Sequence, residues 1–141
     1  MTWFGSWSAR GGVYAASWPR DRLGYFEPFR GNKMRSLHEA HVVSAPIDLE
    51  GKPARVFLNV DGLSEHSRID VEVLSERLET VPGYTREECV APTASGLRQA
   101  VRWREHDRIR NVDGSVRLRL GFGGLRPEDP RIYAIYVVES D

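Results

Sequence analysis

The chain of 141 residues is long enough for one domain with a hydrophobic core of its own. Its 20 Lys and Arg residues balance its 20 Asp and Glu residues, so no net charge attracts nucleic acid or an anionic membrane. With Cys89 as the single cysteine, the sequence excludes an intramolecular disulfide and any cysteine-based zinc or redox motif.

The first 29 residues are rich in aromatic side chains. Small and aromatic residues at 2–8 and 13–19 flank a Gly-Gly pair, which predicts a β-hairpin. Aromatic residues at this density need a partner surface. We expect a hairpin over residues 1–29, a polar connector over 30–42 and one domain over 43–141.

No cationic leader precedes a long apolar run at the start of the sequence. No later stretch approaches the ~18 apolar residues that a membrane-spanning helix needs. We therefore expect neither export nor a membrane span, and the sequence indicates no particular cellular compartment.

Hydrophobic periodicity predicts five β-strands. Residues 54–60 and 131–138 are apolar on both faces, so these two strands are expected to lie centrally or under another layer. Residues 68–74, 97–103 and 115–122 alternate apolar and polar side chains, which is typical of strands with one buried face.

The alternation also assigns faces to single residues. Val71 is expected to point into the core, and Trp103 likewise. Asp70 and Glu72 are expected to point outward with Arg68 and to form solvated ion pairs across strands, worth about 0.5 kcal/mol each.

Turn signals separate the predicted strands. They lie at Gly51 to Pro53, Asp61-Gly62, Pro82-Gly83, Asp113-Gly114 and Asp129-Pro130. No helical period is sustained over ten residues. Short strands separated by turns predict an all-β, antiparallel β-sandwich, jelly-roll-like, with the N-terminal hairpin attached.

A series of short motifs follows in order through residues 43–138. They are a strand ending near Asn59, a Val-x-Val strand at 71–73, a Pro-Gly-Tyr turn at 82–84, the pair Glu88 and Cys89, Val-x-Trp at 101–103, Val-Arg-Leu-x-Leu at 116–120 and Tyr-Ala at 133–134. This order resembles the C-terminal β-sandwich that follows five-bladed propellers in glycosidase-like proteins, including sialidase-like and sucrose-hydrolase-like sequences. The hairpin over residues 1–29 resembles the last propeller blade.

The resemblance implies the accessory half of an enzyme-like protein. The catalytic blades are absent from this sequence, and no catalytic residue carries over. We expect a protein that is not an enzyme and has no cofactor.

The residues themselves offer no reaction centre. His38 and His41 are three positions apart, whereas a zinc-binding helix places two histidines four apart. The glycines at 121–124 are followed by neither a lysine nor a helix start, so we expect a bulge or wide turn rather than a phosphate loop. The two glutamates before Cys89 are expected to raise its thiol pKa, which favours a packing role.

Two functions follow from these patterns. The first is a structural buttress that associates with a second copy of itself through the aromatic hairpin. The alternative is a carbohydrate-binding module, in which exposed aromatic rings stack on sugars and nearby polar side chains bind the hydroxyl groups. Its candidate platform is Trp3, Trp7, Trp18 and Tyr84, with Asn59, Asp61, Arg86 and Glu88 as polar partners.

Overall fold

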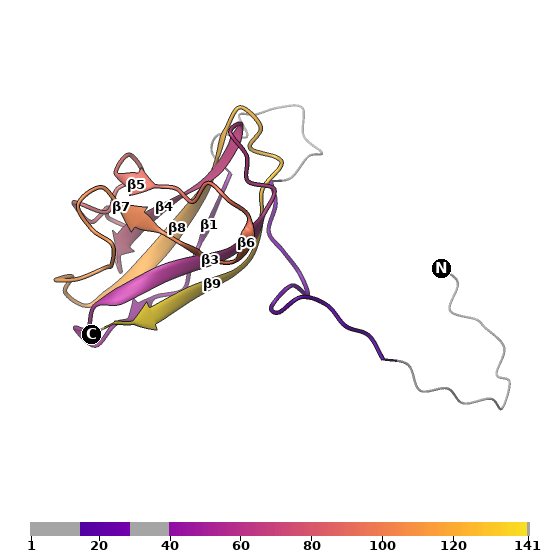
Figure 1. Cartoon of the computed structure of the whole chain (residues 1–141). Helices are drawn as coiled ribbons and strands as arrows, with labels where there is room; N and C mark the ends of the chain where they lie inside the picture. The colour runs from indigo at the N-terminus through magenta and orange to yellow at the C-terminus, as the bar shows by residue number, and fades with distance from the viewer. Residues whose placement is uncertain (1–14, 29–39, 141) are drawn as a thin grey trace, which may run out of the picture.

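The computed structural model describes residues 15–28 and 40–140 (Figure 1). These residues contain β-strands, turns and irregular segments, and no helix is found among them. All strand pairs are antiparallel. The described part of the chain is therefore all-β, as predicted, and it contains no helix that could cross a membrane.

The first sheet is built on β8 (Ser115–Gly124), which pairs with β4 (Ser67–Ser75) over nine residues. The other edge of β8 pairs with the short strands β1 (His41–Val43) and β2 (Ile47–Asp48). β1 begins inside the predicted connector. A strand of three residues is too short to show a hydrophobic period, so only its backbone pairing with β8 identifies it.

The second sheet has the order β6-β3-β9, with β3 (Ala54–Asp61) between β6 (Gly96–Ala100) and β9 (Arg131–Glu139). β3 is central, as predicted. β9 is instead an edge strand among the described residues, bridged on its free side by Phe26. Its apolar outer face is explained by the N-terminal segment that lies against it.

The predicted strand over residues 97–103 is divided between two sheets. The N–H of Val101 donates to the carbonyl of Val56 at 2.9 Å, and the chain then leaves β3. β7 (Arg102–Trp103) pairs with β5 (Cys89–Val90) in a separate two-stranded ladder. The hydrophobic period does not indicate this break, because Val101 and Trp103 both point inward on either side of it.

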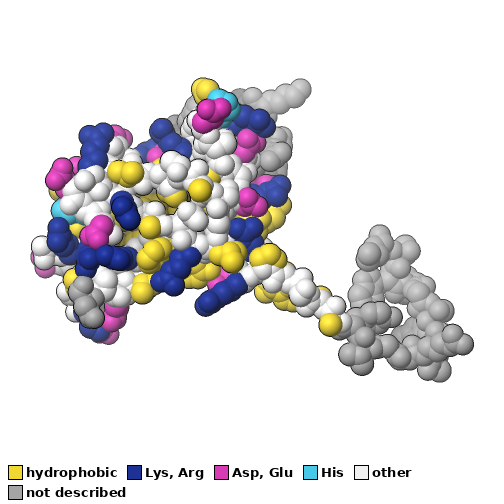
Figure 2. Space-filling model, viewed as in Figure 1, with side chains coloured by type: hydrophobic (Ala, Val, Ile, Leu, Met, Phe, Trp, Pro, Cys, Tyr) yellow, Lys and Arg dark blue, Asp and Glu magenta, His cyan; other side chains and the backbone are white. Residues whose placement is uncertain are grey.

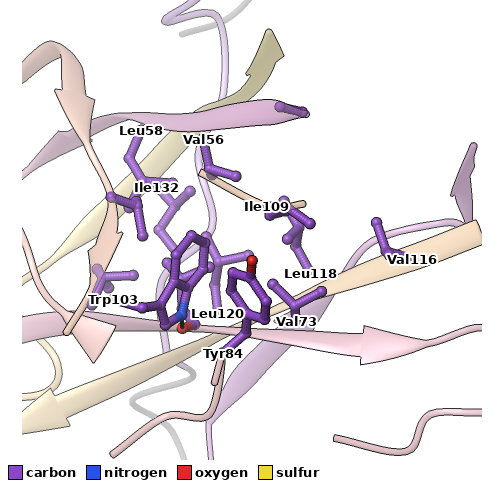
Figure 3. Close-up of a cluster of buried hydrophobic side chains, with 14 of the residues drawn as sticks. Val56, Leu58, Val73, Tyr84, Trp103, Ile109, Val116, Leu118, Leu120 and Ile132 are labelled. Atoms are coloured by element: carbon purple, nitrogen blue, oxygen red, sulfur yellow. Dashed lines mark hydrogen bonds between the residues drawn. The ribbon is translucent and has the colours of Figure 1, made fainter. Parts of the chain in front are cut away.

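One hydrophobic core contains side chains from both larger sheets (Figure 3). The predicted inward faces of β4 and β8 are both buried, but on β4 the outward-facing Asp70, Glu72 and Leu74 are buried as well. Residues outside the two larger sheets complete the core, with Trp103 of β7 and Tyr84 side by side. Each fully buried aliphatic side chain contributes about 1.5–3 kcal/mol. The central members of the core are Val56, Leu58, Val60, Ile69, Val71, Val73, Ile109, Leu118, Leu120 and Phe122.

Two side chains protect the edge of β4 that faces away from β8. The N–H of Val71 donates to Cys89 Sγ at 3.2 Å, and Trp103 Nε1 donates to the carbonyl of Val71 at 3.0 Å. Backbone groups that would otherwise be unpaired are thus satisfied without another strand. Trp103 is a core residue, as predicted.

The glycines at the end of β8 do not form a bulge. The register between β4 and β8 continues without a shift to the pair Ser67 and Gly124. Gly124 ends the strand with φ of +93°, as a turn leaving the strand requires, whereas the expected bulge is absent because Gly121 and Gly123 lie within the strand. Their role is to leave space above it.

Residues 15–19, the described part of the second strand of the predicted hairpin, form no strand. The rest of that hairpin, and most of the predicted connector, lie outside the described residues. Further along the N-terminal segment, Phe26 exchanges two backbone hydrogen bonds with Ile132, at 2.8 and 3.0 Å.

Candidate functional site

Of the eight residues predicted to bind carbohydrate, the six that the structure describes do not form one surface. Trp3 and Trp7 lie outside the described residues. The Trp18 side chain is exposed, whereas Asn59 and Tyr84 are buried. The other three candidates, Asp61, Arg86 and Glu88, each bind a partner within the chain.

The expectation that Tyr84 is exposed was wrong. Pro82 and Gly83 form a tight turn in which Gly83 has φ of +87° and the N–H of Tyr84 donates to the carbonyl of Val81 at 3.1 Å. This turn directs the Tyr84 ring inward, edge-on to Trp103 with centroids 5.1 Å apart. Its hydroxyl also accepts a hydrogen bond from the N–H of Arg110 at 3.1 Å.

Asn59 fastens the N-terminal segment to β3. Its side chain is fully buried on the outer face of the second sheet. The amide oxygen accepts a hydrogen bond from Arg22 Nε at 2.9 Å, and the amide nitrogen donates to the carbonyl of Arg20 at 2.9 Å. Asn59 is therefore engaged within the chain and offers no contact to a sugar.

The other polar candidates are also engaged. Asp61 accepts a hydrogen bond from the N–H of Gly62 at 2.9 Å and lies 3.5 Å from Arg22. Glu88 accepts hydrogen bonds from the N–H and hydroxyl of Thr85, which lower the pKa of its carboxyl. These contacts stabilise turns.

Arg86 belongs to a charged hollow on the outer face of the first sheet. The hollow has a volume of about 320 Å³ and is lined by Ala40, His41, Asp70, Glu72, Arg86, Arg119 and Gly121. We call this set the charged hollow. His38, the other half of the histidine pair in the sequence, lies outside the described residues.

Asp70 and Glu72 point to the outer face, as predicted, but they are not solvated. Each is only 5% exposed. Asp70 Oδ2 accepts from Arg68 Nε at 3.1 Å and from Arg86 Nε at 3.3 Å. The guanidinium groups cover the carboxylates from above, which the alternation of one strand could not indicate.

Glu72 is held by two partners. Arg119 donates from both Nε and Nη2 to Glu72 Oε2, with Nε at 2.7 Å, and Thr80 donates its hydroxyl proton to Oε1 at 3.0 Å. Charge-assisted bonds of this kind are stronger than those between neutral groups. They hold the Arg119 guanidinium in one orientation at the rim of the charged hollow.

Glycines of β8 form the floor beneath these charges. Gly121 lies opposite Asp70, and Gly123 lies opposite Arg68. A Cβ at Gly123 would lie 3.0 Å from Asp70 Oδ2, whereas one at Gly121 would have Arg86 Cζ as its nearest neighbour, at 3.9 Å. The glycines allow long charged side chains to lie flat on a sheet.

Sequence reasoning missed the charged hollow as a unit. The signal was present as two glycines alternating in a strand and two carboxylates alternating in another. Only the register between β4 and β8 places Gly121 beside Asp70. Because antiparallel register depends on tertiary pairing, the sequence alone does not indicate it.

The hollow can bind by charge and hydrogen bonding. Within residues 15–28 and 40–140, no three His, Cys, Asp or Glu side chains gather as a metal site would require.

Cys89 is a half-buried free thiol whose pKa is raised to about 11, chiefly by burial. The sequence predicted this direction, but burial rather than the neighbouring glutamates is the main cause.

Comparisons with models of protein families, with curated proteins and with solved structures found no match to this chain. The resemblance of its motif order to a glycosidase-associated sandwich therefore stays a prediction.

A second surface feature is apolar. The N-terminal segment exposes Trp18, Leu23, Tyr25 and Phe26, with Leu23 79% exposed. Nearby, a hollow of about 400 Å³ is lined by Arg20, Leu97, Arg98, Tyr136 and Val138. Figure 2 shows hydrophobic side chains among Lys and Arg along the lower edge of the molecule, up to where this segment leaves it.

Several contacts hold that apolar segment in place. Tyr136 donates its hydroxyl proton to Asp21 at 2.7 Å, and the Arg22 guanidinium lies 4.5 Å from the centre of the Tyr133 ring. The Tyr25 ring meets Tyr133 edge-on, with centroids 5.6 Å apart. The backbone of the segment is thus fastened while its large side chains face outward.

Proposed function

We propose that this chain is a non-catalytic accessory module with a jelly-roll-like β-sandwich fold, of the kind associated with glycosidase-like proteins. It acts as a structural buttress and associates with a second copy of itself. One observation carries this proposal: apolar side chains stay exposed on a segment whose backbone is fastened to the sheet.

The energetics of the segment support docking. The partly buried hydrogen bond from Arg22 to Asn59 helps to hold it and is worth about 1.5–3 kcal/mol because one partner is charged. In this arrangement Leu23 and Phe26 remain 79% and 58% exposed. A fixed apolar surface loses little conformational entropy when a partner covers it.

Carbohydrate binding is the second candidate. It is favoured by Trp18, whose side chain is 53% exposed, whereas that of Trp103 is buried in the core. A sugar ring stacks on such an indole face. The predicted partners Asn59 and Tyr84 are buried, however, so this candidate rests on fewer side chains than the sequence indicated.

Light scattering tests the first proposal. We expect the full chain to be a dimer or larger and the double variant Leu23→Ser, Phe26→Ser to be a monomer, because the variant removes apolar area without touching Asn59 or Arg22. The control is Leu78→Ser, Leu125→Ser, which changes two other exposed leucines.

The control should keep the mass of the parent protein. A monomeric parent would contradict self-association and would make glycan binding at Trp18 the leading function. Dissociation of the control to the same extent would show that the apolar segment is not the specific interface.

A further inference from the structure

We propose that the charged hollow binds a small oxyanion, a carboxylate or a phosphate group, through the guanidinium groups of Arg86 and Arg119. This inference is independent of the proposed function. It concerns the opposite face of the chain, on the sheet of β1, β8 and β4.

The balance of charge favours an anion. Three guanidinium groups, those of Arg68, Arg86 and Arg119, stand against two carboxylates. Asp70 alone is shared by two of the arginines through one oxygen atom. Within the lining, Arg86 and Arg119 balance Asp70 and Glu72, and Arg68, which pairs with Asp70 from outside the lining, adds one positive charge beside it.

The donors needed for an anion are present. Among the described residues, Arg86 uses only Nε, toward Asp70, and Arg119 uses Nε and Nη2, toward Glu72. Both Nη atoms of Arg86 and the Nη1 atom of Arg119 have no hydrogen-bond partner among these residues. Their side chains are 41% and 40% exposed, so these donors are accessible.

The buried carboxylates prepare the donors. Asp70 and Glu72, each 5% exposed, are too enclosed to be ordinary surface charges. Through their hydrogen bonds they restrict two long side chains that would otherwise lose considerable rotamer entropy on binding. Planar guanidinium groups fixed in this way can donate two parallel hydrogen bonds to two oxygens of a carboxylate or a phosphate.

The floor of the hollow supplies the space. Gly121 carries no side chain, and a Cβ there would still be 3.9 Å from Arg86 Cζ. The volume of about 320 Å³ is large enough for an oxyanion with a small carbon skeleton. Any other residue at Gly121 would project into this space, between His41 and Asp70 on the neighbouring strands.

Titration followed by NMR tests the proposal on the full chain. The probes are inorganic phosphate, acetate and gluconate, each as the sodium salt with sodium chloride as the reference at matched ionic strength. We expect saturable chemical-shift changes at the amide of Gly121 and at Arg86 Nε. The probe that binds more tightly shows whether the hollow prefers a phosphate or a carboxylate.

Two variants and a control locate the binding. Arg86→Gln should weaken binding about tenfold or more, because it removes a charged donor pair while Arg68 still pairs with Asp70. Gly121→Val should abolish binding by filling the hollow and leaves every charge in place. Arg55→Gln, which changes an arginine paired with Asp107, should bind as the parent does.

Shifts that appear equally with sodium chloride, or none at Gly121 with any probe, would overturn the proposal. Equal weakening by Arg55→Gln and Arg86→Gln would also overturn it, because binding would then reflect general surface charge. If Gly121→Val is unfolded, the comparison of Arg86→Gln with Arg55→Gln still decides.

Discussion

Cys89 and Trp103 show how single side chains can take the place of a neighbouring strand. Sγ of Cys89 accepts the N–H of Val71, and the indole N–H of Trp103 donates to the carbonyl of the same residue. The thiol must stay protonated in this half-buried position, and burial accordingly raises its pKa to about 11. A chemically reactive role would require the opposite shift.

The thiol should make stability depend on alkaline pH. The unfolded chain loses the Cys89 proton near the ordinary thiol pKa of about 8.5, while the folded chain keeps it until about 11. Between these values the folded state binds more protons, so the free energy of unfolding falls as pH rises, by about 3 kcal/mol in total.

Urea unfolding of the parent and of Cys89→Ser from pH 7 to pH 11 measures this effect. Serine keeps an acceptor for the N–H of Val71 but does not ionise in this range. We expect the stability difference between the two proteins to shift in favour of Cys89→Ser as pH rises. Parallel curves would contradict the pKa assignment.

At the scale of elements, β8 combines two tasks. One face places Val116, Leu118, Leu120 and Phe122 in the core, and the other face carries Arg119 and the glycines below the charged hollow. Glycine is unfavourable within a strand, because it loses backbone entropy and buries no side chain. Gly121 and Gly123, the two on this outer face, are explained by the charged side chains that lie across the strand.

Gly123→Ala and Gly121→Ala should therefore differ although both are glycines of one strand face. A Cβ at 123 would lie 3.0 Å from Asp70 Oδ2 and 3.2 Å from Arg68 Nε, so these partners must move. A Cβ at 121 meets only ordinary contacts. We expect Gly123→Ala to be less stable than Gly121→Ala by about 1 kcal/mol in urea unfolding.

Equal stability of the two variants would mean that the ion pairs of Asp70 rearrange at no cost. Gly121→Ala serves as the matched control, since it introduces the same methyl group into the same strand. Crosspeaks of Arg68 Nε should change only in Gly123→Ala.

At the scale of the whole molecule, the two larger sheets share one core. Val56 and Leu58 come from β3, and Val71 comes from β4, yet all three belong to the same buried cluster. No described segment provides a second core that could fold alone. The described residues from 40 to 140 should therefore unfold as a unit.

Val71→Asp tests this cooperativity. Val71 is 0% exposed, and a buried carboxylate without a partner costs several kcal/mol, which is comparable to the stability of a domain of this size. We expect hydrogen exchange to lose protection in β3 and β9 as well as in β4. Leu78→Asp, at a position 58% exposed in the turn that follows β4, is the control for added charge.

Protection retained in β3 and β9 alone would show that the second sheet folds independently. Loss in both variants would assign the effect to the added charge rather than to burial at Val71.

Five strands and their buried faces could be predicted because a period of two residues is a local property of the sequence. Val71 and Trp103 were placed inward on this basis, and both are buried. The short strands β1, β2 and β5 could not be predicted, because two or three residues carry no period. Tyr84 was misplaced because the turn at Pro82 and Gly83 directs it inward, and turn residues alone do not indicate which side a neighbouring ring takes.

The sequence by itself determined the all-β class, the inward faces of the long strands and the turns between them, since each depends on neighbouring residues. Only the tertiary structure decided that Asp70, Arg86, Arg119 and Gly121 meet in one hollow, and that Asn59 fastens a distant segment. These sites join residues that are far apart in the chain. Their geometry depends on register and on the path of loops, which a pattern of hydrophobicity does not contain.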